Sequence, residues 1–539
     1  MLIIVVVVFS IAFRFYGRYL EKLWDTKPEE KTPAHTKYDG VDYIPAKHWT
    51  ILFGHHFSSI AGAGPILGPV IAGVLWGWGP ALAWIVLGSI FLGGVHDFSS
   101  LVLSLKHDGQ TVGQITKNIL GEKSKLIFSF FLWLALILVI AVFAAVTAKT
   151  FAEDPRIVVP SFGLIFVAVI FGYFVYRKNV NFVLVTLVSL ALIGLLLFEG
   201  KNFPVQIPGE NAVKVWILIL LVYAFVASVL PVNILLQPRD YLSSFILFFG
   251  LFFGFLGLLV SHPTTNAPFF VSFNSSKGPL LPMMFVMIAC GAISGFHSLV
   301  SSGTTSKQLP DAKHARHIAY GSMLTEGILA AVALLCVSAG LYWNSPFSEL
   351  NYPSLMQKGN WIGTFATGYG IIVSKIFSSD IGKLIAMVMV NSFVLTTLDT
   401  ATRITRYITS EIFGQSFRIQ MLNNRFFATL CIVFFAAYLA IGPWEKIWPV
   451  FGASNQLVAG LVLFVCSCFL MMKRKNSLST LIPAIAMLFI TIAALIYQAI
   501  GFYKSRHLLL GNISVILIIL AFFIILEGAE TIRKLRKNP

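Results

Sequence analysis

Charged residues are scarce in this sequence, and their scarcity argues against a soluble protein. Only 12% of the 539 residues are charged, whereas 57% are hydrophobic. Soluble domains carry about 25% charged residues, so a water-exposed surface would hold too many apolar groups. The composition therefore predicts a protein that lies in the lipid bilayer. The 14% of aromatic residues agrees with this, because Trp and Tyr gather where the bilayer meets water.

Three further features are lacking, and each argues against a class of function. The five cysteines lie inside apolar runs and show neither metal-ligand spacing nor a disulfide framework. The basic residues never form a patch interleaved with aromatics, so the net charge of +16 predicts no nucleic-acid partner. No phosphate-binding loop of the Walker type is present, which argues against an ATP-driven pump. We therefore expect no resident metal or cofactor.

The chain is predicted to consist of about fifteen membrane-spanning helices, each of ~20 residues. The first, residues 1–20, reads as a retained span, because no basic residue precedes it and no small-residue cleavage site follows it. The other predicted spans are 51–73, 80–105, 126–148, 158–176, 181–198, 213–236, 242–261, 282–304, 318–341, 380–400, 426–441, 448–472, 478–500 and 511–528. The Gly-rich stretch 363–377 is left open as a re-entrant segment.

The positions of the basic residues predict the orientation. With the N-terminus outside, most of the 39 Lys and Arg residues fall in cytoplasmic loops, as the positive-inside rule requires. An odd number of spans then places the C-terminus in the cytoplasm. We predict a multi-pass protein of the cell inner membrane with this orientation.

The second predicted span breaks the rules for a simple anchor. It reads HFSSIAGAGPILGPVIAG and places glycines and two prolines at mid-membrane. Proline removes a backbone donor, and freed backbone groups survive at bilayer depth only where protein or water satisfies them. A discontinuous helix that binds substrate is therefore expected, and close helix packing through small residues is the alternative. The candidate substrate-binding residues here are His55, His56, Ser58, Ser59, Gly62, Ala63, Gly64 and Pro65.

A second interruption is predicted at Pro231 and Asn233, inside the seventh span. Two interrupted helices, one in each half, point to a transporter site built on inverted repeats. The predicted first repeat is 51–198 and the second is 213–408, so that five spans in each run in opposite directions. Residues 1–20 would add one N-terminal helix, and 426–528 would add about four C-terminal helices. Pro231 and Asn233 are taken as substrate-binding candidates.

The ninth predicted span carries a polar stripe that includes His297. Hydroxyls in lipid can bond their own backbone, so a few of them mean little. Six polar residues at helical spacing, one of them a histidine, favour the lining of a polar cavity. The stripe is Ser294, His297, Ser298, Ser301, Ser302 and Thr305. Of these, His297 is a substrate-binding candidate, and Ser301, Ser302 and Thr305 are ion-coupling candidates.

Ionisable groups inside the membrane are costly and therefore functional by default. His96 and Asp97 lie deep in the third span, and Asp240 follows the second interruption. These three are ion-coupling candidates. Asp399 and Arg403 are four residues apart, the spacing of a helical ion pair. With Arg239 they form a predicted gate, and a purely structural pair is the alternative. Glu326 in the tenth span is a further ionisable candidate.

Several of these stretches resemble the carbon starvation protein A (CstA) family. The similar motifs are YDGVDYIPAKHWTILFGHHFSSIAGAGPILGPVIAG, LLQPRDYL, SGFHSLVSSGTTSKQL, TTLDTATRITRY and WPVFGASNQLVAG. They cover roughly residues 1–470. The resemblance implies a bacterial inner-membrane transporter of peptides or of pyruvate, induced on nutrient starvation, with a LeuT-like 5+5 fold. It does not choose between the two substrates.

The favoured hypothesis is secondary active transport by alternating access. A substrate carboxylate would lie at half-helix N-termini, because their free N–H groups and positive dipole suit an anion. The coupling ion, H⁺ or Na⁺, is left open. The rival from another class is a membrane-embedded metal or redox enzyme whose ligands would be His55, His56, His96, Asp97 and His297. A channel is the third hypothesis.

Overall fold

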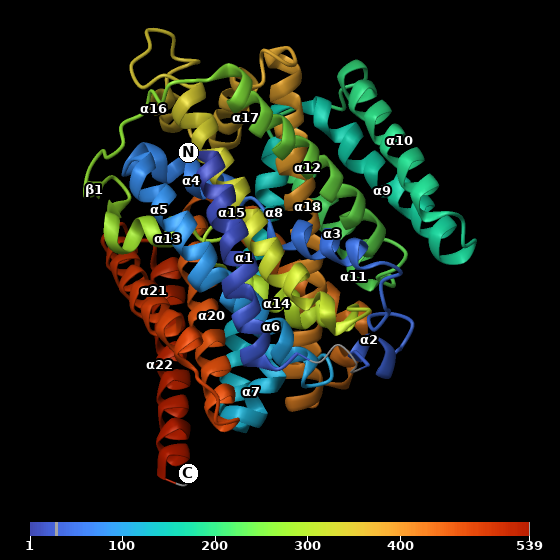
Figure 1. The fold of residues 1–539 in the computed structure, drawn as a ribbon, viewed down its shortest axis with the longest axis vertical. Coiled ribbons are helices and arrows are strands. Elements are labelled where there is room, and N and C mark those ends of the chain that lie inside the picture. The colour runs from blue at the N-terminus through green and yellow to red at the C-terminus, as the bar shows by residue number, and fades with distance from the viewer. Residues whose placement is uncertain (27–30, 443, 538–539) are drawn as a thin grey trace.

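The computed structural model describes residues 1–26, 31–442 and 444–537, and the chain is built almost wholly of helices (Figure 1). Among these residues, twelve helices are long and apolar enough to cross a membrane, and the bent pair α3 (Trp49–Ile60) and α4 (Gly64–Leu75) adds a thirteenth. The predicted span 426–441 is the shorter apolar helix α19 (Arg425–Ala440). The predicted span 282–304 is interrupted rather than continuous.

The long spans follow the order that the sequence predicts. They are α1 (Leu2–Trp24), α5 (Trp78–Gly88) continued through a π-helical turn (Ser89–Gly93) into α6 (Gly94–Leu105), α8 (Glu122–Glu153), α9 (Val158–Gly172), α10 (Phe182–Asn202), α11 (Ala212–Val229), α12 (Leu236–Ser261), α15 (Ala315–Gly340), α18 (Ser379–Thr409), α20 (Trp444–Met472), α21 (Leu478–Lys504) and α22 (Leu508–Lys537). Residue 443, inside the predicted range 426–528, lies outside the described residues.

Shorter elements connect these spans. They are α2 (Pro33–Thr36), α7 (Val112–Leu120), the hairpin of β1 (Asn274–Ser275) with β2 (Gly278–Pro279), α13 (Phe285–Met287), α14 (Gly295–Gly303), α16 (Tyr352–Gln357) and α17 (Trp361–Ile372). The Gly-rich stretch predicted at 363–377 forms most of α17, which packs against α15 and α18.

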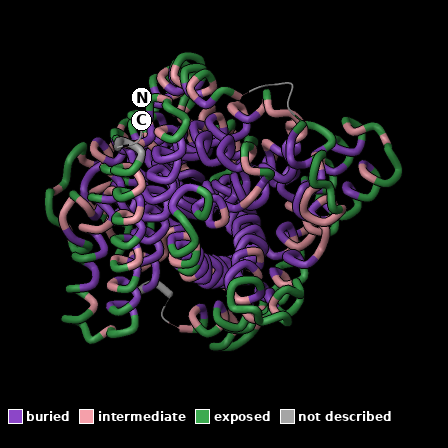
Figure 2. Tube along the Cα trace, turned by 90° about the horizontal axis from the view of Figure 1, so that it is seen from below, coloured by how far each residue is buried: buried purple, intermediate pink, exposed green. Residues whose placement is uncertain are grey.

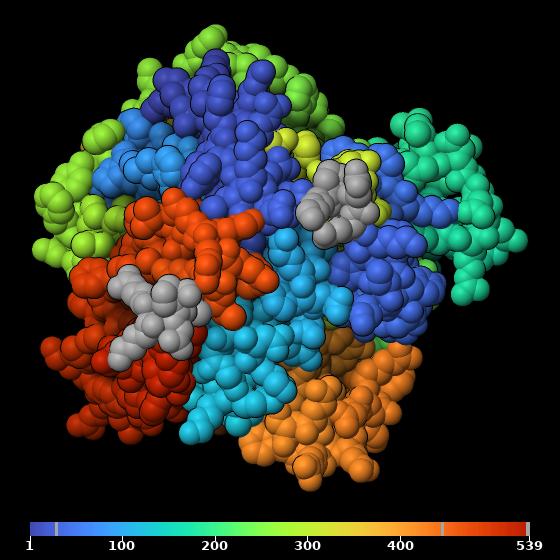
Figure 3. All heavy atoms as spheres, turned by 60° about the horizontal axis from the view of Figure 1, so that its bottom comes forward, coloured from blue at the N-terminus to red at the C-terminus, as the bar shows by residue number. Residues whose placement is uncertain are grey.

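Burial is arranged as expected for a protein surrounded by lipid. Buried residues fill the centre of the bundle and exposed residues form its outer turns (Figure 2), yet many exposed side chains are apolar, such as Phe166 (70%) and Phe434 (70%). The α9–α10 hairpin stands at the edge of the bundle in Figures 1 and 3. The two ends of the chain lie at opposite ends of the molecule (Figure 1).

The predicted break in the second span is present. The chain leaves helical geometry after Ile60 and restarts at Gly64, with a bend of 41° between α3 and α4. Pro65 lies in the first turn of α4, where its missing N–H costs no helical hydrogen bond. The start of α4 packs against the link between α13 and α14: a Cβ at Gly64 would lie 2.6 Å from Cys290 Sγ. The second interruption therefore lies between Met287 and Gly295.

The structure differs from the sequence prediction at Pro231 and Asn233. The seventh span ends at Val229 and the next begins at Leu236, so both residues lie in the connection between two spans. Val232 N donates to Val41 O at 3.0 Å, which ties this connection to the loop before α3. A proline stops a helix equally well at the end of a span and in its middle, and the sequence pattern does not distinguish the two. The repeat boundaries at 51–198 and 213–408 stay predictions.

Replacing Gly68 with alanine is expected to destabilise the protein by about 1–3 kcal/mol, as overpacking does. A Cβ at Gly68 would lie 2.6 Å from the carbonyl oxygen of Met287, which is backbone and cannot rotate away. Thermal unfolding in detergent measures the effect as a lower midpoint. Gly194→Ala on α10 is the control, since no atom lies within 4 Å of its added Cβ. Equal midpoints for the two variants would contradict close packing at the break.

Candidate functional site

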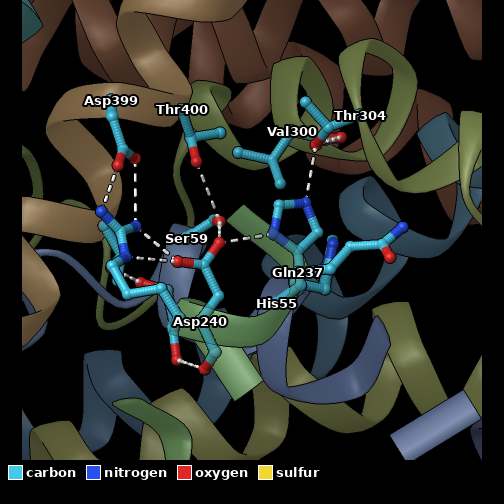
Figure 4. A network of polar contacts seen from close by, with 12 residues as sticks. His55, Ser59, Gln237, Asp240, Val300, Thr304, Asp399 and Thr400 are labelled. Atoms are coloured by element: carbon cyan, nitrogen blue, oxygen red, sulfur yellow. Dashed lines mark hydrogen bonds and ion pairs between the residues drawn. The ribbon is translucent and has the colours of Figure 1, made fainter. Parts of the chain in front are cut away.

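Two chains of buried polar groups run beside the break between α3 and α4, and the first is centred on Asp240 of α12. His55 on α3 has Nδ1 2.5 Å from Asp240 Oδ2, and its Nε2 lies 3.2 Å from Thr304 Oγ1 (Figure 4). Because an ionised carboxylate only accepts hydrogen bonds, Nδ1 of His55 carries the hydrogen. Ser59, one turn further along α3, contacts Asp240 Oδ2 at 3.4 Å and Thr400 Oγ1 at 3.2 Å.

Arg239 joins this chain to α18. Its guanidinium lies between Asp240 and Asp399, with Nε 3.0 Å from Asp240 Oδ1 and Nη2 3.0 Å from Asp399 Oδ1. Tyr223 on α11 donates its hydroxyl to Asp399 Oδ2 at 2.8 Å. Asp240 and Asp399 are fully buried, and Arg239 is 1% exposed. One cation between two carboxylates holds α11, α12 and α18 together, since a buried charge requires a partner.

The predicted helical pair of Asp399 with Arg403 does not form. Asp399 pairs with Arg239, whereas Arg403 pairs with Asp42 in the loop before α3, at 2.7 Å from Nη1 to Oδ1. Arg403 also donates to the carbonyl of Ala227 at 2.7 Å, and Arg406 reaches Asp42 Oδ2 at 3.1 Å. The reason is geometric: groups on other helices offer closer partners than the next turn of α18. The three predicted gate residues thus belong to two ion-pair clusters.

Asp42 stays ionised in this cluster. Burial opposes its ionisation, but Arg403, Arg406 and Lys307 outweigh burial and hold the pKa of Asp42 below its ordinary value. A depressed carboxylate pKa contributes stability above the ordinary value of about 3.9, and that contribution is lost only as the pH falls further. The contact between the loop and α18 therefore persists throughout the neutral range.

The second buried chain is centred on Asp97 of α6. Asp97 accepts from two imidazoles, with Oδ1 3.0 Å from His96 Nδ1 and Oδ2 3.0 Å from His297 Nδ1. On its other side, His297 Nε2 lies 3.3 Å from Glu326 Oε2 of α15. All four side chains are fully buried. Three predicted candidates and Glu326 are thus brought together from α6, α14 and α15.

The remaining candidates of the polar stripe lie around these chains. Thr305, in the turn after α14, has Oγ1 2.8 Å from His56 Nδ1. Ser301 Oγ lies 3.5 Å from the backbone oxygen of Asp97. Ser302 donates to Ser298 O at 2.8 Å, within its own helix. The predicted single helical face is shortened, because α14 covers only Gly295–Gly303.

The end of α3 is held by hydroxyls from α18. Thr396 Oγ1 donates to the carbonyl of Ser58 at 2.6 Å, and Thr397 Oγ1 donates to the carbonyl of Ser59 at 3.0 Å. Ser58 Oγ in turn donates to the carbonyl of Asp240 at 3.0 Å. These bonds satisfy carbonyls freed by the helix break, as a break at bilayer depth requires.

The half-helix N-termini differ in what they offer a ligand. At the start of α14, the N–H of Phe296 is already used, because it donates to Asn455 Oδ1 of α20 at 2.8 Å. At the start of α4, Pro65 has no N–H and the N–H of Ile66 donates to Ala63 O at 3.2 Å, so the predicted carboxylate site depends on the N–H groups of Ala63 and Gly64. Gly62 completes this region: a Cβ there would lie 3.2 Å from both Phe143 and Thr397. Pro231 and Asn233 lie elsewhere in the chain, in the connection between α11 and α12.

Sequence reasoning missed several residues that adjoin the Asp240 chain and the Arg403–Asp42 ion-pair cluster. Gln308 and Gln237 are buried and bonded to each other at 2.8 Å, next to His55. Lys307 lies 3.9 Å from the centre of the Tyr407 ring. A signal existed for Lys307 and Gln308, since both directly follow the polar stripe. Asp42 lies within the quoted YDGVDYIPAKHW motif, but one carboxylate in a polar loop does not indicate which residues it pairs with.

The geometry gives no support to the metalloenzyme hypothesis. Within residues 1–26, 31–442 and 444–537, no group of three or more His, Cys, Asp or Glu residues could hold a metal ion. The five candidate ligands instead have separate partners: His55 is paired to Asp240, His56 to Thr305, and His96 and His297 to Asp97.

Comparisons with known proteins agree with the sequence motifs. The family model described as carbon starvation protein CstA matches residues 1–360 and 344–494. A Helicobacter pylori protein (strain 26695) named peptide transporter CstA is 30% identical, over 94% of this chain and 82% of its own length. The Escherichia coli K12 protein with the same name is 31% identical, over 91% and 79%. The Escherichia coli K12 pyruvate/proton symporter BtsT is 29% identical, over 90% and 80%.

A solved structure shows the same fold. The manganese transporter of Eremococcus coleocola matches 93% of this chain and 99% of its own chain, with a TM-score of 0.55. At 14% sequence identity, this likeness concerns the fold alone. It confirms the prediction of an all-α, polytopic fold of the kind that this solved structure has.

Proposed function

This chain belongs to the carbon starvation protein CstA family, and from that premise we propose that it imports a small carboxylate-bearing solute, a short peptide or pyruvate, by coupling its movement to an ion gradient. The chain is a secondary transporter and not an enzyme. Relatives carry either substrate in their names, and both substrates offer a carboxylate. We propose the inner membrane, with the N-terminus outside, as its location.

The observation that carries this proposal is the meeting of two interrupted helices beside two buried charged chains. The break after Ile60 packs against the link between α13 and α14. Interrupted helices at bilayer depth are the usual site of substrate and ion binding in transporters. The substrate carboxylate would lie at the start of α4, where the N–H groups of Ala63 and Gly64 and the positive end of the helix dipole would favour an anion. His55, His56 and Ser59 are nearby polar groups.

The two ion-pair clusters supply a gate. Arg239 with Asp399 and Arg403 with Asp42 join α12, α18 and the loop before α3. Under the predicted orientation this is the cytoplasmic side, so we propose that both clusters separate when the inner side opens. Alternating access requires two arrangements of comparable free energy. The ion pairs would stabilise the arrangement that is closed on the inner side.

We propose the proton as the coupling ion. One relative is named as a proton symporter, and the chain of His96, Asp97, His297 and Glu326 consists of groups that exchange protons. Serine and threonine hydroxyls near the break leave Na⁺ as the alternative. Accumulation driven by a pH gradient without Na⁺, compared with accumulation driven by a Na⁺ gradient at equal pH, separates the two ions.

Counterflow in proteoliposomes tests the substrate. Vesicles loaded with unlabelled pyruvate or an unlabelled dipeptide are diluted into the labelled form of the same solute. We expect saturable exchange above the level of protein-free vesicles for at least one of the two solutes. A protein that inserts and folds normally but exchanges neither solute would contradict the proposed function.

A further inference from the structure

Glu326 stands out because it is a fully buried carboxyl group without a hydrogen-bond donor. Neither of its oxygens has a hydrogen-bond partner, and its exposed fraction is 0%. Among the described residues, the group within ion-pair distance is His297, whose Nε2 is 3.3 Å from Oε2 without hydrogen-bond alignment. An ionised carboxylate left unpaired in such a site is very costly, and a buried group usually becomes neutral instead.

The hydrogen bonds of Asp97 decide which nitrogen of His297 faces Glu326. Asp97 uses one oxygen for His96 Nδ1 and the other for His297 Nδ1, both at 3.0 Å. Because a carboxylate only accepts, Nδ1 of each ring carries a hydrogen. In neutral His297, Nε2 then carries a lone pair and lies 3.3 Å from Glu326 Oε2. A lone pair facing an ionised carboxylate would be repulsive, so one more proton is required between these two groups.

The surrounding groups do not replace that proton. On α6, Asp97 is itself a carboxylate and supplies no cation, and His96 is already bonded to Asp97 at 3.0 Å. In the link between α13 and α14, Cys290 donates its S–H to Ser294 Oγ at 3.5 Å. On α3, His56 is bonded to Thr305. Among the described residues, no Lys or Arg side chain forms an ion pair with Glu326, Asp97 or His297.

We propose that one proton, shared between the Glu326 carboxyl and His297 Nε2, is the proton that this transporter carries. In the state seen here Glu326 holds it as a carboxylic acid. When α14 moves, the O–H bond of Glu326 breaks and an Nε2–H bond forms on His297, which becomes an imidazolium paired with Asp97. Loss of that proton to the other side restores neutral His297, and Glu326 then takes up a new proton from the first side, which closes the cycle. The proton is only transferred, so no electrons change hands.

The position of the site explains how proton and solute would be coupled. Asp97, His297 and Glu326 come from α6, α14 and α15, and α14 begins at the interruption that packs against the break after Ile60. A substrate that alters the break must therefore alter the distance between His297 and its two carboxyl neighbours. Coupling requires an element with two arrangements whose equilibrium is shifted by both the proton and the solute. In this proposal that element is α14. This inference rests on the proposed transport function.

Glu326→Gln tests the proposal, because it keeps the shape of the side chain and removes its proton exchange. In proteoliposomes we expect loss of accumulation driven by a pH gradient, down to passive equilibration, while solute counterflow without a gradient remains measurable. Glu326→Asp retains a carboxyl group and is expected to keep coupled accumulation at a reduced rate. Accumulation by Glu326→Gln equal to that of the unaltered protein would overturn the proposal.

A spectroscopic measurement decides the question independently of transport. Infrared difference spectra of the full-length protein, with and without Glu326→Gln, should contain a carboxylic-acid C=O band at neutral pH that the variant lacks. If Glu326→Gln does not fold, Glu326→Asp is expected to shift that band. A carboxylate band in its place would overturn the inference even if transport occurs. Failure of counterflow in the unaltered protein would instead contradict the proposed function.

Discussion

Replacement of Arg239 with methionine is expected to destabilise the protein by about 3–5 kcal/mol, the cost of removing one partner of a buried ion pair. The change leaves Asp240 and Asp399 facing each other without a cation, and both are fully buried. Asp240 keeps His55 as a partner, whereas Asp399 keeps only the hydroxyl of Tyr223. The yield of monodisperse protein and the thermal midpoint in detergent should both fall sharply.

Two comparisons make this result specific. Arg239→Met combined with Asp399→Asn should recover part of the lost stability. The second substitution removes the negative charge of Asp399, which Arg239→Met leaves buried without a cation. Arg177→Met is the matched control, since Arg177 is exposed at the end of the α9 span and surface charges contribute about 0–1 kcal/mol. If Arg239→Met and Arg177→Met behaved alike, the guanidinium would not hold α12 to α18.

The break after Ile60 could be predicted from the sequence because its causes are local. Gly62, Gly64 and Pro65 lie within four residues, and each alters the backbone whatever surrounds it. The second interruption, between Met287 and Gly295, could not be predicted in the same way, because its sequence contains no proline. It depends on close packing: a Cβ at Gly291 would lie 2.7 Å from Ala330 on α15. Such contacts exist only once the helices are assembled.

The ionisable residues show the same limit. Helical spacing correctly marks Asp97, His297 and Arg403 as groups that cannot face lipid, so their burial follows from the sequence. The partner of each group does not, since spacing along one helix says nothing about the neighbouring helix. Asp399 and Arg403 illustrate this, because the i,i+4 rule paired them and the structure gives them Arg239 and Asp42. The family motifs predicted the transporter fold, which depends on many residues at once.

Replacement of Asp97 with asparagine is expected to reduce the initial rate of uptake by about 100-fold or more, the size of effect that follows loss of a positioned proton-transfer group. Asparagine has the shape of aspartate but offers one acceptor oxygen, whereas His96 and His297 each donate to Asp97 at 3.0 Å. One of the two rings must then face an NH₂ group and move its hydrogen from Nδ1 to Nε2. For His297 this would direct an N–H, not a lone pair, at Glu326.

Asp97→Asn should therefore lose both gradient-driven accumulation and counterflow, in contrast to Glu326→Gln, because the ring of His297 is no longer held in place between α6 and α15. Initial uptake rates in proteoliposomes measure the loss, and an unchanged thermal midpoint shows that the variant is folded. Asp380→Asn, in the first turn of α18, is the control, since the carboxylate of Asp380 is 53% exposed and pairs with Arg156. Normal uptake by folded Asp97→Asn would remove Asp97, and with it the orientation of His297, from the transport mechanism.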